Sequence, residues 1–346
     1  MNFNKLLKYK NFIWWPVIIF ILIVILFASY VILSQPKPRQ DMKFGVTYSL
    51  NYVEELGIDW QAAYDAMLDD LGVRYIRLPI YWNQIEPSPG KFDFTMYDYF
   101  IQRAEESGAK VTAVVGRRQP RWPECHVPQW AQGNSETVQQ RNILFAIEAT
   151  VKHFKDSQAL VVWQVDNEPL FRIFGVCPEP DIKFVQEEIA LVKSLDPTRP
   201  IQITDSGELS TWLQTAHMAD QLGISMYRTT WNQTFGYFYY PLGPNFYKRH
   251  AKIVAPLVDR IVISELQAEP WFPNRPVPGV ELAEQYKSMN PEVFKRNIDF
   301  ARRTGFDESY LWGVEWWYWL KEKKGDSGMW DVARELFSTQ KTIVNN

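Results

Sequence analysis

The sequence is poor in the side chains that most often bind metal ions. Among its 346 residues there are only two cysteines and four histidines. Cys125-His126 has no second ligand pair at the spacing of a zinc site, so we predict neither a metal nor another cofactor. Basic residues are not in excess either: 37 Lys and Arg stand against 40 Asp and Glu, a net charge of −3. Without a basic stripe, nucleic acid is not expected as a partner.

A glycine-rich phosphate loop is also missing, which argues against an open, doubly wound sheet. The chain instead has eight short apolar runs, each followed by enough residues for a helix. Strands that alternate with helices predict a parallel sheet, and eight such units close into a barrel. We therefore predict an α/β fold with a single (β/α)8 TIM barrel over residues 43–340. The runs are 44–48, 73–78, 111–115, 159–165, 201–204, 221–227, 261–264 and 310–314.

The first forty residues have a different composition. Lysines precede an uncharged run from Phe12 to Leu33, which as a helix of about 1.5 Å per residue would cross a hydrocarbon layer of about 30 Å. We predict a short cytoplasmic head (1–11), a single-pass transmembrane signal anchor (12–34) in the lipid bilayer and a linker (35–42). The barrel would then lie outside the cytoplasm at the cell membrane. A cleavable signal peptide is the alternative, although the apolar run is longer than usual for one.

One carboxylate follows a buried strand in a way that indicates function. The apolar run 159–165 ends abruptly in Asp166-Asn167-Glu168-Pro169. Pro169 cannot donate a ladder hydrogen bond and disfavours helical geometry at Glu168, so the strand should end there. Glu168 would thereby stand at the carboxyl end of a strand, where barrel active sites lie. The simpler alternative is an ordinary loop carboxylate after a core strand.

Two sequence motifs resemble one group of enzymes. The run W-Q-V-D-N-E-P resembles the strand-4 signature of clan A glycoside hydrolases, the retaining (β/α)8 glycosidases, and the chain resembles glycoside hydrolase family 5 and its relatives in that clan. The stretch 81–94 resembles the clan's W-x-x-I-E-P-x-x-G-x-(F/Y)-D-F loop, in which Trp82 and Glu86 would hold the loop. The resemblance implies that Glu168 is the general acid/base.

A second carboxylate is needed for this chemistry, because retention requires two carboxyl groups roughly 5 Å apart. The apolar run 261–264 leads into Glu265, and the chain between Glu168 and Glu265 has room for three further βα units. We predict that Glu265 is the nucleophile, as the clan places it at the seventh strand. The rival carboxylates are Asp205, Glu269 and Glu315.

Three polar side chains are assigned around this pair. Arg77 lies late in the second predicted strand, where a buried guanidinium needs a partner; Glu265 is the natural one, and the pair would keep Glu265 ionised. An ordinary salt bridge is the alternative. By resemblance, Asn167 would bind the hydroxyl next to the reacting carbon, and Tyr227 would hydrogen-bond the nucleophile. Family 5 usually has a His two positions before that Tyr, whereas this sequence has Ser225.

Aromatic residues are abundant, at 15% of the chain, and flat rings in loops suit sugar binding. The clan often places a Trp at the end of the eighth strand as the floor of the reacting subsite, a role for Trp316 or Trp317. Other rings that follow predicted strands are expected to form an aromatic wall along one cleft. These are Trp122, Trp130, Trp231 and Trp271.

The two cysteines, Cys125 and Cys177, follow the third and fourth predicted strands, so their loops share one end of the barrel. A disulfide is allowed outside the cytoplasm, although sequence spacing alone does not prove one. We predict that they are bridged or close enough to bridge.

Together these residues predict a membrane-anchored retaining glycosidase that cleaves a poly- or oligosaccharide, with β specificity and endo action favoured. A catalytically silent carbohydrate-binding barrel, used for attachment, is the alternative from another class. A transglycosylase would use the same residues and differ only in its acceptor. The sequence leaves the glycan, its linkage and the oligomeric state open.

Overall fold

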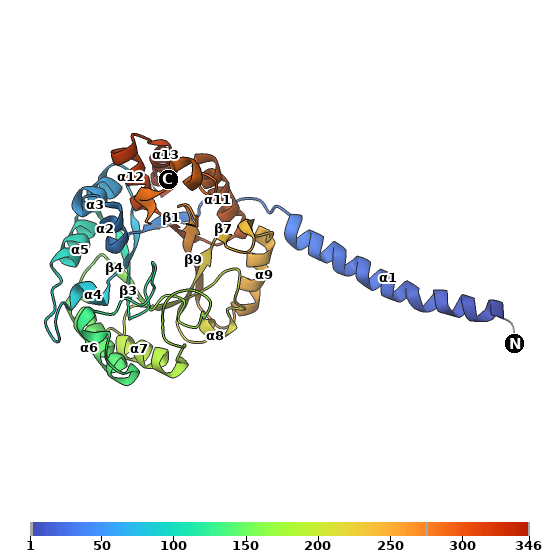
Figure 1. Cartoon of the computed structure of the whole chain (residues 1–346), viewed down its shortest axis with the longest axis horizontal. Coiled ribbons are helices and arrows are strands. Elements are labelled where there is room, and N and C mark those ends of the chain that lie inside the picture. Colours follow the sequence, from blue (N-terminus) through green and yellow to red (C-terminus); the bar gives the residue numbers. More distant parts are fainter. Residues whose placement is uncertain (1–2, 274–275, 345–346) are drawn as a thin grey trace.

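The computed structural model describes residues 3–273 and 276–344, and in this part of the chain eight parallel strands close into a barrel (Figure 1). The order around the barrel is β1-β10-β9-β6-β5-β4-β3-β2. The predicted TIM barrel is therefore confirmed. The strands are β1 (Lys43–Thr47), β2 (Tyr75–Pro79), β3 (Lys110–Val115), β4 (Leu160–Val165), β5 (Ile201–Asp205), β6 (Gln221–Met226), β9 (Arg260–Gln267) and β10 (Glu308–Trp312).

The barrel closes between the first and the last of these strands. β1 and β10 pair in parallel, from Lys43 opposite Glu308 to Thr47 opposite Trp312. The strands are rich in β-branched residues, which pack well on a pleated surface, and nearly all their residues are buried because helices cover the outside and side chains fill the inside. Each strand therefore reads as a nearly continuous apolar run, as the sequence predicts.

Helices form the outer ring of the barrel (Figure 1). The apolar face of α6, with Ile143, Ile147, Val151 and Phe154, is buried against the barrel. Asp181 begins α7 by accepting hydrogen bonds from the first backbone N–H groups of that helix. The helices after the N-terminal one are α2 (Leu50–Leu56), α3 (Trp60–Asp69), α4 (Trp82–Ile85), α5 (Thr95–Ser107), α6 (Glu136–Phe154), α7 (Ile182–Leu195), α8 (Leu213–Ala216), α9 (Pro244–Val254), α10 (Leu282–Gln285), α11 (Pro291–Thr304), α12 (Val314–Trp319) and α13 (Gly328–Val344).

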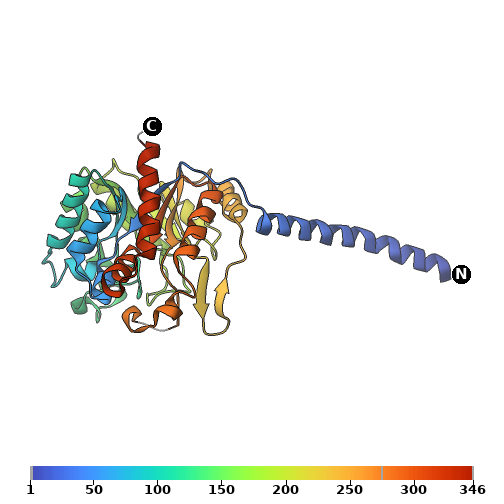
Figure 2. The same ribbon diagram turned by 90° about the horizontal axis from the view of Figure 1, so that it is seen from above.

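Two further strands were not predicted. β7 (Thr229–Asn232) and β8 (Gly236–Tyr239) form an antiparallel hairpin directly after β6. Figure 2 shows this hairpin beside the short α10 segment, and the hydroxyl of Tyr237 donates to Glu284 in that helix at 2.6 Å. The hairpin thus lengthens the barrel end that carries the loops after the strands.

The N-terminal helix α1 (Phe3–Leu33) leads away from the barrel (Figures 1 and 2). No helix in the described part of the chain is both long and apolar enough to cross a membrane. The transmembrane anchor predicted at 12–34 is therefore not supported by the structure. The described side chains of α1 cover only 14–30, and those of 12–13 and 31–33 lie outside the described residues.

Two loops at the site end of the barrel are joined covalently. Cys125, in the β3–α6 loop, and Cys177, in the β4–α7 loop, form a disulfide with a Cα–Cα distance of 5.4 Å, which confirms the predicted pairing. The loop after β2, residues 81–94, is not joined by this disulfide but is held by hydrogen bonds to Glu86. The indole N–H of Trp82 donates to one carboxylate oxygen of Glu86 at 2.6 Å, and the backbone N–H of Gly90 donates to the other at 2.7 Å.

We expect the disulfide to contribute substantially to stability. It closes a loop of 52 residues, for which the chain-entropy relation gives roughly 4 kcal/mol. The Cys125→Ser/Cys177→Ser variant and the reduced wild type should therefore both unfold at a lower urea concentration than the oxidised wild type. The double variant in the presence of reductant is the control. Equal midpoints for oxidised and reduced wild type would contradict the expectation.

Candidate active site

A cavity of about 400 Å³ opens at the carboxyl ends of the barrel strands. Its lining includes the end of the Asn-Glu-Pro segment, Asn167 and Glu168, together with Tyr227 after β6 and Glu265 in β9. The structure therefore brings both predicted carboxylates into one cavity. Barrel enzymes place their active sites at this end because eight separate loops can contribute side chains there.

The Asn-Glu-Pro segment is a sharp turn with positive backbone φ angles, 54° at Asp166 and 45° at Glu168. Such angles are unfavourable for residues other than glycine and persist only where surrounding contacts fix them. Here Asn167 N–H donates to the carbonyl of Arg118 at 2.6 Å and Glu168 N–H to the hydroxyl of Thr204 at 2.8 Å. A Cβ atom on Gly116 would overlap the carboxylate of Asp166, so only glycine leaves room for the turn.

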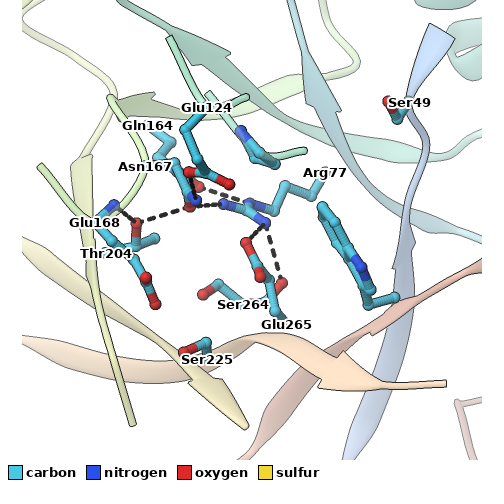
Figure 3. Close-up of polar contacts among 12 residues, drawn as sticks. Ser49, Arg77, Glu124, Gln164, Asn167, Glu168, Thr204, Ser225, Ser264 and Glu265 are labelled. Atoms are coloured by element: carbon cyan, nitrogen blue, oxygen red, sulfur yellow. Dashed lines mark hydrogen bonds and ion pairs between the residues drawn. The ribbon is translucent and has the colours of Figure 1, made fainter. Parts of the chain in front are cut away.

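Arg77 connects the two halves of the site, as Figure 3 shows. Its side chain is completely buried. One guanidinium nitrogen donates to Glu265 at 2.8 Å, a second to the side-chain amide oxygen of Asn167 at 2.7 Å, and the third to the side-chain amide oxygen of Gln164 at 2.8 Å. The predicted ion pair between Arg77 and Glu265 is thus present, and it also orients Asn167.

Glu265 lies inside β9 rather than after its end. The register between β6 and β9 shifts there, from Ile224 opposite Ile263 to Ser225 opposite Glu265, and such a bulge re-aims side chains. One carboxylate oxygen of Glu265 accepts from Arg77, and the other accepts from the Tyr227 hydroxyl at 3.0 Å. Both oxygens are therefore bound by donors, and the predicted contact of Tyr227 with Glu265 is present.

Glu168 has the opposite environment. It is buried, and desolvation together with the negative charge of Glu265 raises the pKa of Glu168 to about 8, while a hydrogen bond to Ser225 partly opposes the shift. Ser225 thus contacts one of the candidate catalytic carboxyls. A site with one carboxyl bound by a cation and another that holds its proton near neutral pH is suited to acid/base chemistry on a bound molecule.

A row of aromatic rings follows one side of the cavity. Trp122, Phe174, Trp271 and Tyr227 are successive neighbours, with ring centroids 5.6, 5.6 and 5.3 Å apart. All four line the cavity, as does Trp231. The expected aromatic wall therefore includes Trp122, Trp231 and Trp271. The remaining Trp of the prediction, Trp130, is not part of this lining; its indole N–H donates to the carbonyl of Glu86 at 2.8 Å.

The prediction for the floor of the site is wrong. Trp316 and Trp317 are fully buried outside the cavity, and their indole N–H groups donate to Gln285 and to the carbonyl of Ala268, both at 2.7 Å. The reason is that β10 ends at Trp312 and these residues belong to the following helix α12. The residue that lines the cavity from the eighth barrel strand is Trp312.

Similarity to known proteins shows the family of this chain. Residues 43–244 match the family model described as cellulase, glycosyl hydrolase family 5. The chain belongs to this family. The clan A assignment made from the sequence is thereby confirmed. A search of curated proteins finds no match.

Solved structures similar to this family 5 chain share its fold at low sequence identity. Xylanase 10B from Thermotoga maritima is 16% identical with a TM-score of 0.56, over 89% of this chain and 97% of the xylanase. A β-galactosidase from the haloarchaeon Halorubrum lacusprofundi is 17% identical with a TM-score of 0.57 and covers 86% of this chain. The chain spans only 58% of the length of that β-galactosidase.

The rival carboxylates of this family 5 chain have other partners. Glu315 is buried, does not line the cavity, and accepts from the backbone N–H of Ser49 and from Arg121. Glu269 does line the cavity but forms an ion pair with Arg121. Asp205 accepts from Ser210 and Thr215, each at 2.7 Å. Among the described residues, no group of three His, Cys, Asp or Glu side chains could hold a metal ion.

Two lining residues of the family 5 site were missed in the sequence. Glu208 accepts from the Tyr247 hydroxyl at 2.6 Å and from the backbone N–H of Tyr227 at 3.0 Å. Glu124, in the disulfide-linked loop, accepts from the side chain of Asn167 at 3.0 Å. Neither stands at the end of an apolar run, so the pattern that indicated Glu168 could not find them.

The raised pKa of Glu168 predicts an effect on stability. An acid whose pKa rises on folding, here from 4.5 to about 8, destabilises the folded state progressively as pH increases through that range. Glu168→Gln removes this titration. The free energy of unfolding of the variant should therefore exceed that of the wild type by a few kcal/mol at pH 8.5, as an order of magnitude, and by much less at pH 4.5.

Urea unfolding at both pH values measures this difference. Glu179→Gln changes a carboxylate whose side chain is 84% exposed in the loop that follows the same strand and serves as the control. A constant difference between Glu168→Gln and wild type across the pH range would contradict a raised pKa.

Proposed function

We propose that this protein is a retaining glycoside hydrolase in which Glu265 is the nucleophile and Glu168 the general acid/base. The observation that carries the proposal is the contrast between the two carboxyls of one cavity. Glu265 forms an ion pair with the Arg77 cation and accepts a hydrogen bond from the Tyr227 hydroxyl. Burial keeps a proton on Glu168 by raising its pKa, as a proton donor requires.

The reaction follows from these two states. A carboxylate oxygen of Glu265 attacks the anomeric carbon and forms a glycosyl ester, while Glu168 gives its proton to the departing glycosidic oxygen. Glu168, now ionised, then removes a proton from a water molecule. That water attacks the same carbon and releases Glu265 as the carboxylate and Glu168 as the acid. Asn167, oriented by Arg77, is proposed to bind the hydroxyl next to the reacting carbon.

The substrate class we propose is a β-linked poly- or oligosaccharide cleaved within its length. The row from Trp122 to Tyr227 gives several stacking surfaces along one side of the cavity, which supports binding of more than one sugar unit. A catalytically silent carbohydrate-binding barrel would need the aromatic rings. It would not need a protonated Glu168 in the same cavity as a Glu265 that is paired with Arg77. A transglycosylase would share every residue and differ in the molecule that accepts the sugar.

We expect the two carboxyl variants to fail differently on 2,4-dinitrophenyl β-glycosides of glucose, galactose, mannose, xylose and cellobiose. Glu265→Gln should abolish turnover, because no glycosyl ester can form. Glu168→Gln should retain measurable release of dinitrophenolate, because this leaving group needs no proton, and should lose roughly 10²–10⁴-fold on unactivated β-glycans. Glu179→Gln is the matched control and should behave as wild type.

Products and added nucleophiles complete the test. Azide should accelerate Glu168→Gln by replacing the water that this variant cannot activate. Wild-type rates in both carboxyl variants would exclude the proposed mechanism, as would an inverted anomeric product in the wild type. Monosaccharide as the first product from a glucan would contradict endo action.

We propose that the N-terminal segment holds the enzyme at the cell membrane, with the barrel outside the cytoplasm. The described part of α1 exposes large apolar side chains from Trp14 to Phe27, and apolar surface of this extent is unfavourable in water. The disulfide between Cys125 and Cys177 supports an oxidising compartment. Both observations fit the anchor at 12–34 that the sequence predicts.

Membrane association can be tested in the full chain. After expression in a bacterium, the wild type should stay in the membrane fraction on carbonate extraction, and added protease should reach the barrel in spheroplasts. Ile21→Arg/Ile25→Arg should be extracted, since each Arg at the centre of a span costs about 2.5–3.5 kcal/mol. Complete extraction of the wild type, or a barrel protected in intact spheroplasts, would contradict the proposal.

A further inference from the structure

A third carboxyl group faces the reacting part of the cavity. Glu124 lines the same cavity as Glu168 and Glu265 and is itself only 4% exposed. In Figure 3 its carboxyl group lies next to Asn167. The mechanism above gives this group no role.

Glu124 completes the set of contacts that orients Asn167. The amide oxygen of Asn167 accepts from Arg77 at 2.7 Å and from the Thr204 hydroxyl at 3.1 Å, and its nitrogen donates to one oxygen of Glu124 at 3.0 Å. With both ends of the amide bound, it has a single orientation and keeps one N–H for a ligand.

The second oxygen of Glu124 is different. Within the described residues, this oxygen accepts no hydrogen bond, and it is not one of the fully buried polar atoms without a partner. Since Glu124 lines the cavity, this oxygen is open to a bound molecule. The nearest cation, the Arg118 side chain, lies 3.9 Å from the oxygen that Asn167 already occupies.

The backbone holds Glu124 in place. Its φ angle is 74°, its N–H donates to the carbonyl of Arg121 at 2.7 Å, and its carbonyl accepts from the N–H of Gln119 at 2.7 Å. The next residue, Cys125, is fixed by the disulfide to Cys177. A group held this firmly at the wall of a cavity can position a ligand without first being ordered.

We propose, on the basis of the glycosidase function above, that Glu124 positions Asn167 and binds a hydroxyl of the sugar in the reacting subsite through its open oxygen. The site would then take an uncharged sugar ring there, and Glu124 would contribute to the binding of the transition state without exchanging a proton with the substrate.

The charge state of Glu124 agrees with this role. Burial, and after it the negative charge of Glu265, raises the pKa of Glu124 well above its ordinary value, which favours the protonated, neutral form of the group. Because one oxygen accepts from Asn167, the proton belongs on the open oxygen, which makes it a donor to the sugar. A glutamine reproduces this pattern, with a carbonyl toward Asn167 and an N–H toward the cavity.

The test uses the one of the five dinitrophenyl β-glycosides that the wild type cleaves fastest. On this substrate it compares Glu124→Gln with Glu124→Ala. Glu124→Ala should lose about 10²-fold in kcat/KM, mostly in kcat, as for a hydrogen bond that strengthens in the transition state. Glu124→Gln should recover at least tenfold of that loss. Two analogues of the same glycoside, one without the 2-hydroxyl and one without the 3-hydroxyl, identify the contact. On at least one of them, the loss in kcat/KM that Glu124→Ala causes relative to wild type should fall below about threefold.

Each other outcome overturns the proposal. Glu124→Gln as inactive as Glu124→Ala, with unfolding midpoints like wild type, would mean that an anion or a proton transfer is required. An equal loss for Glu124→Ala on every deoxy analogue would indicate a purely structural role, and no loss would exclude any role. A wild type that cleaves none of the five glycosides contradicts the glycosidase function as well, whereas an active wild type with inactive Glu265→Gln confines the failure to Glu124.

Discussion

The buried guanidinium of Arg77 is the interaction on which the site and much of the barrel interior depend. A fully desolvated cation is tolerated only when each of its donors is bound. Here its partners come from β4, from the turn after it and from β9: Gln164, Asn167 and Glu265. Removing Glu265, the charged partner, would leave the buried cation uncompensated, at about 3–5 kcal/mol. The need to pair this buried guanidinium therefore also sets the orientation of the reactive carboxylate.

The reactive carboxyls differ because their surroundings differ, not because their chemistry does. Glu265 has a cation and a phenol as partners, whereas Glu168 follows a strained turn into a buried position and interacts with the neutral hydroxyl of Ser225. Two carboxyls in one cavity repel when both are ionised. The barrel resolves this conflict by pairing the buried Arg77 with Glu265, while Glu168 keeps its proton.

The parts that the sequence could predict are those determined by local pattern. Buried parallel strands must be apolar along their whole length, so the strands were visible as runs. β4 ends with its apolar run at Val165, three residues before the end at Glu168 that Pro169 predicts. Arg77 could be paired with Glu265 because a charge inside a barrel needs an opposite one. The prediction for Trp316 and Trp317 failed because the apolar run of the sequence continues to Val314. In the structure the strand ends at Trp312, and Gly313, with φ of 131°, leads directly into helix α12.

Other parts depend on contacts between distant segments. Glu124 sits in an irregular loop whose shape comes from its own turns and from the disulfide to the next loop, neither of which leaves a periodic signal. Glu208 reaches the cavity because Tyr247, from α9, and the backbone of Tyr227 bind it. The hairpin β7–β8 has no turn dipeptide of the usual kind; its turn is Gln233-Thr234-Phe235.

The pairing of β1 with β10 has a consequence for how the protein is made. Ribosomes deliver the chain from its N-terminus, so Arg77 emerges 188 positions before Glu265, and the strand that closes the barrel emerges later still. Until then, burying the guanidinium would leave it without its carboxylate. The early strands therefore stay partly hydrated until synthesis is nearly complete. The cavity forms only when the last barrel strands are available.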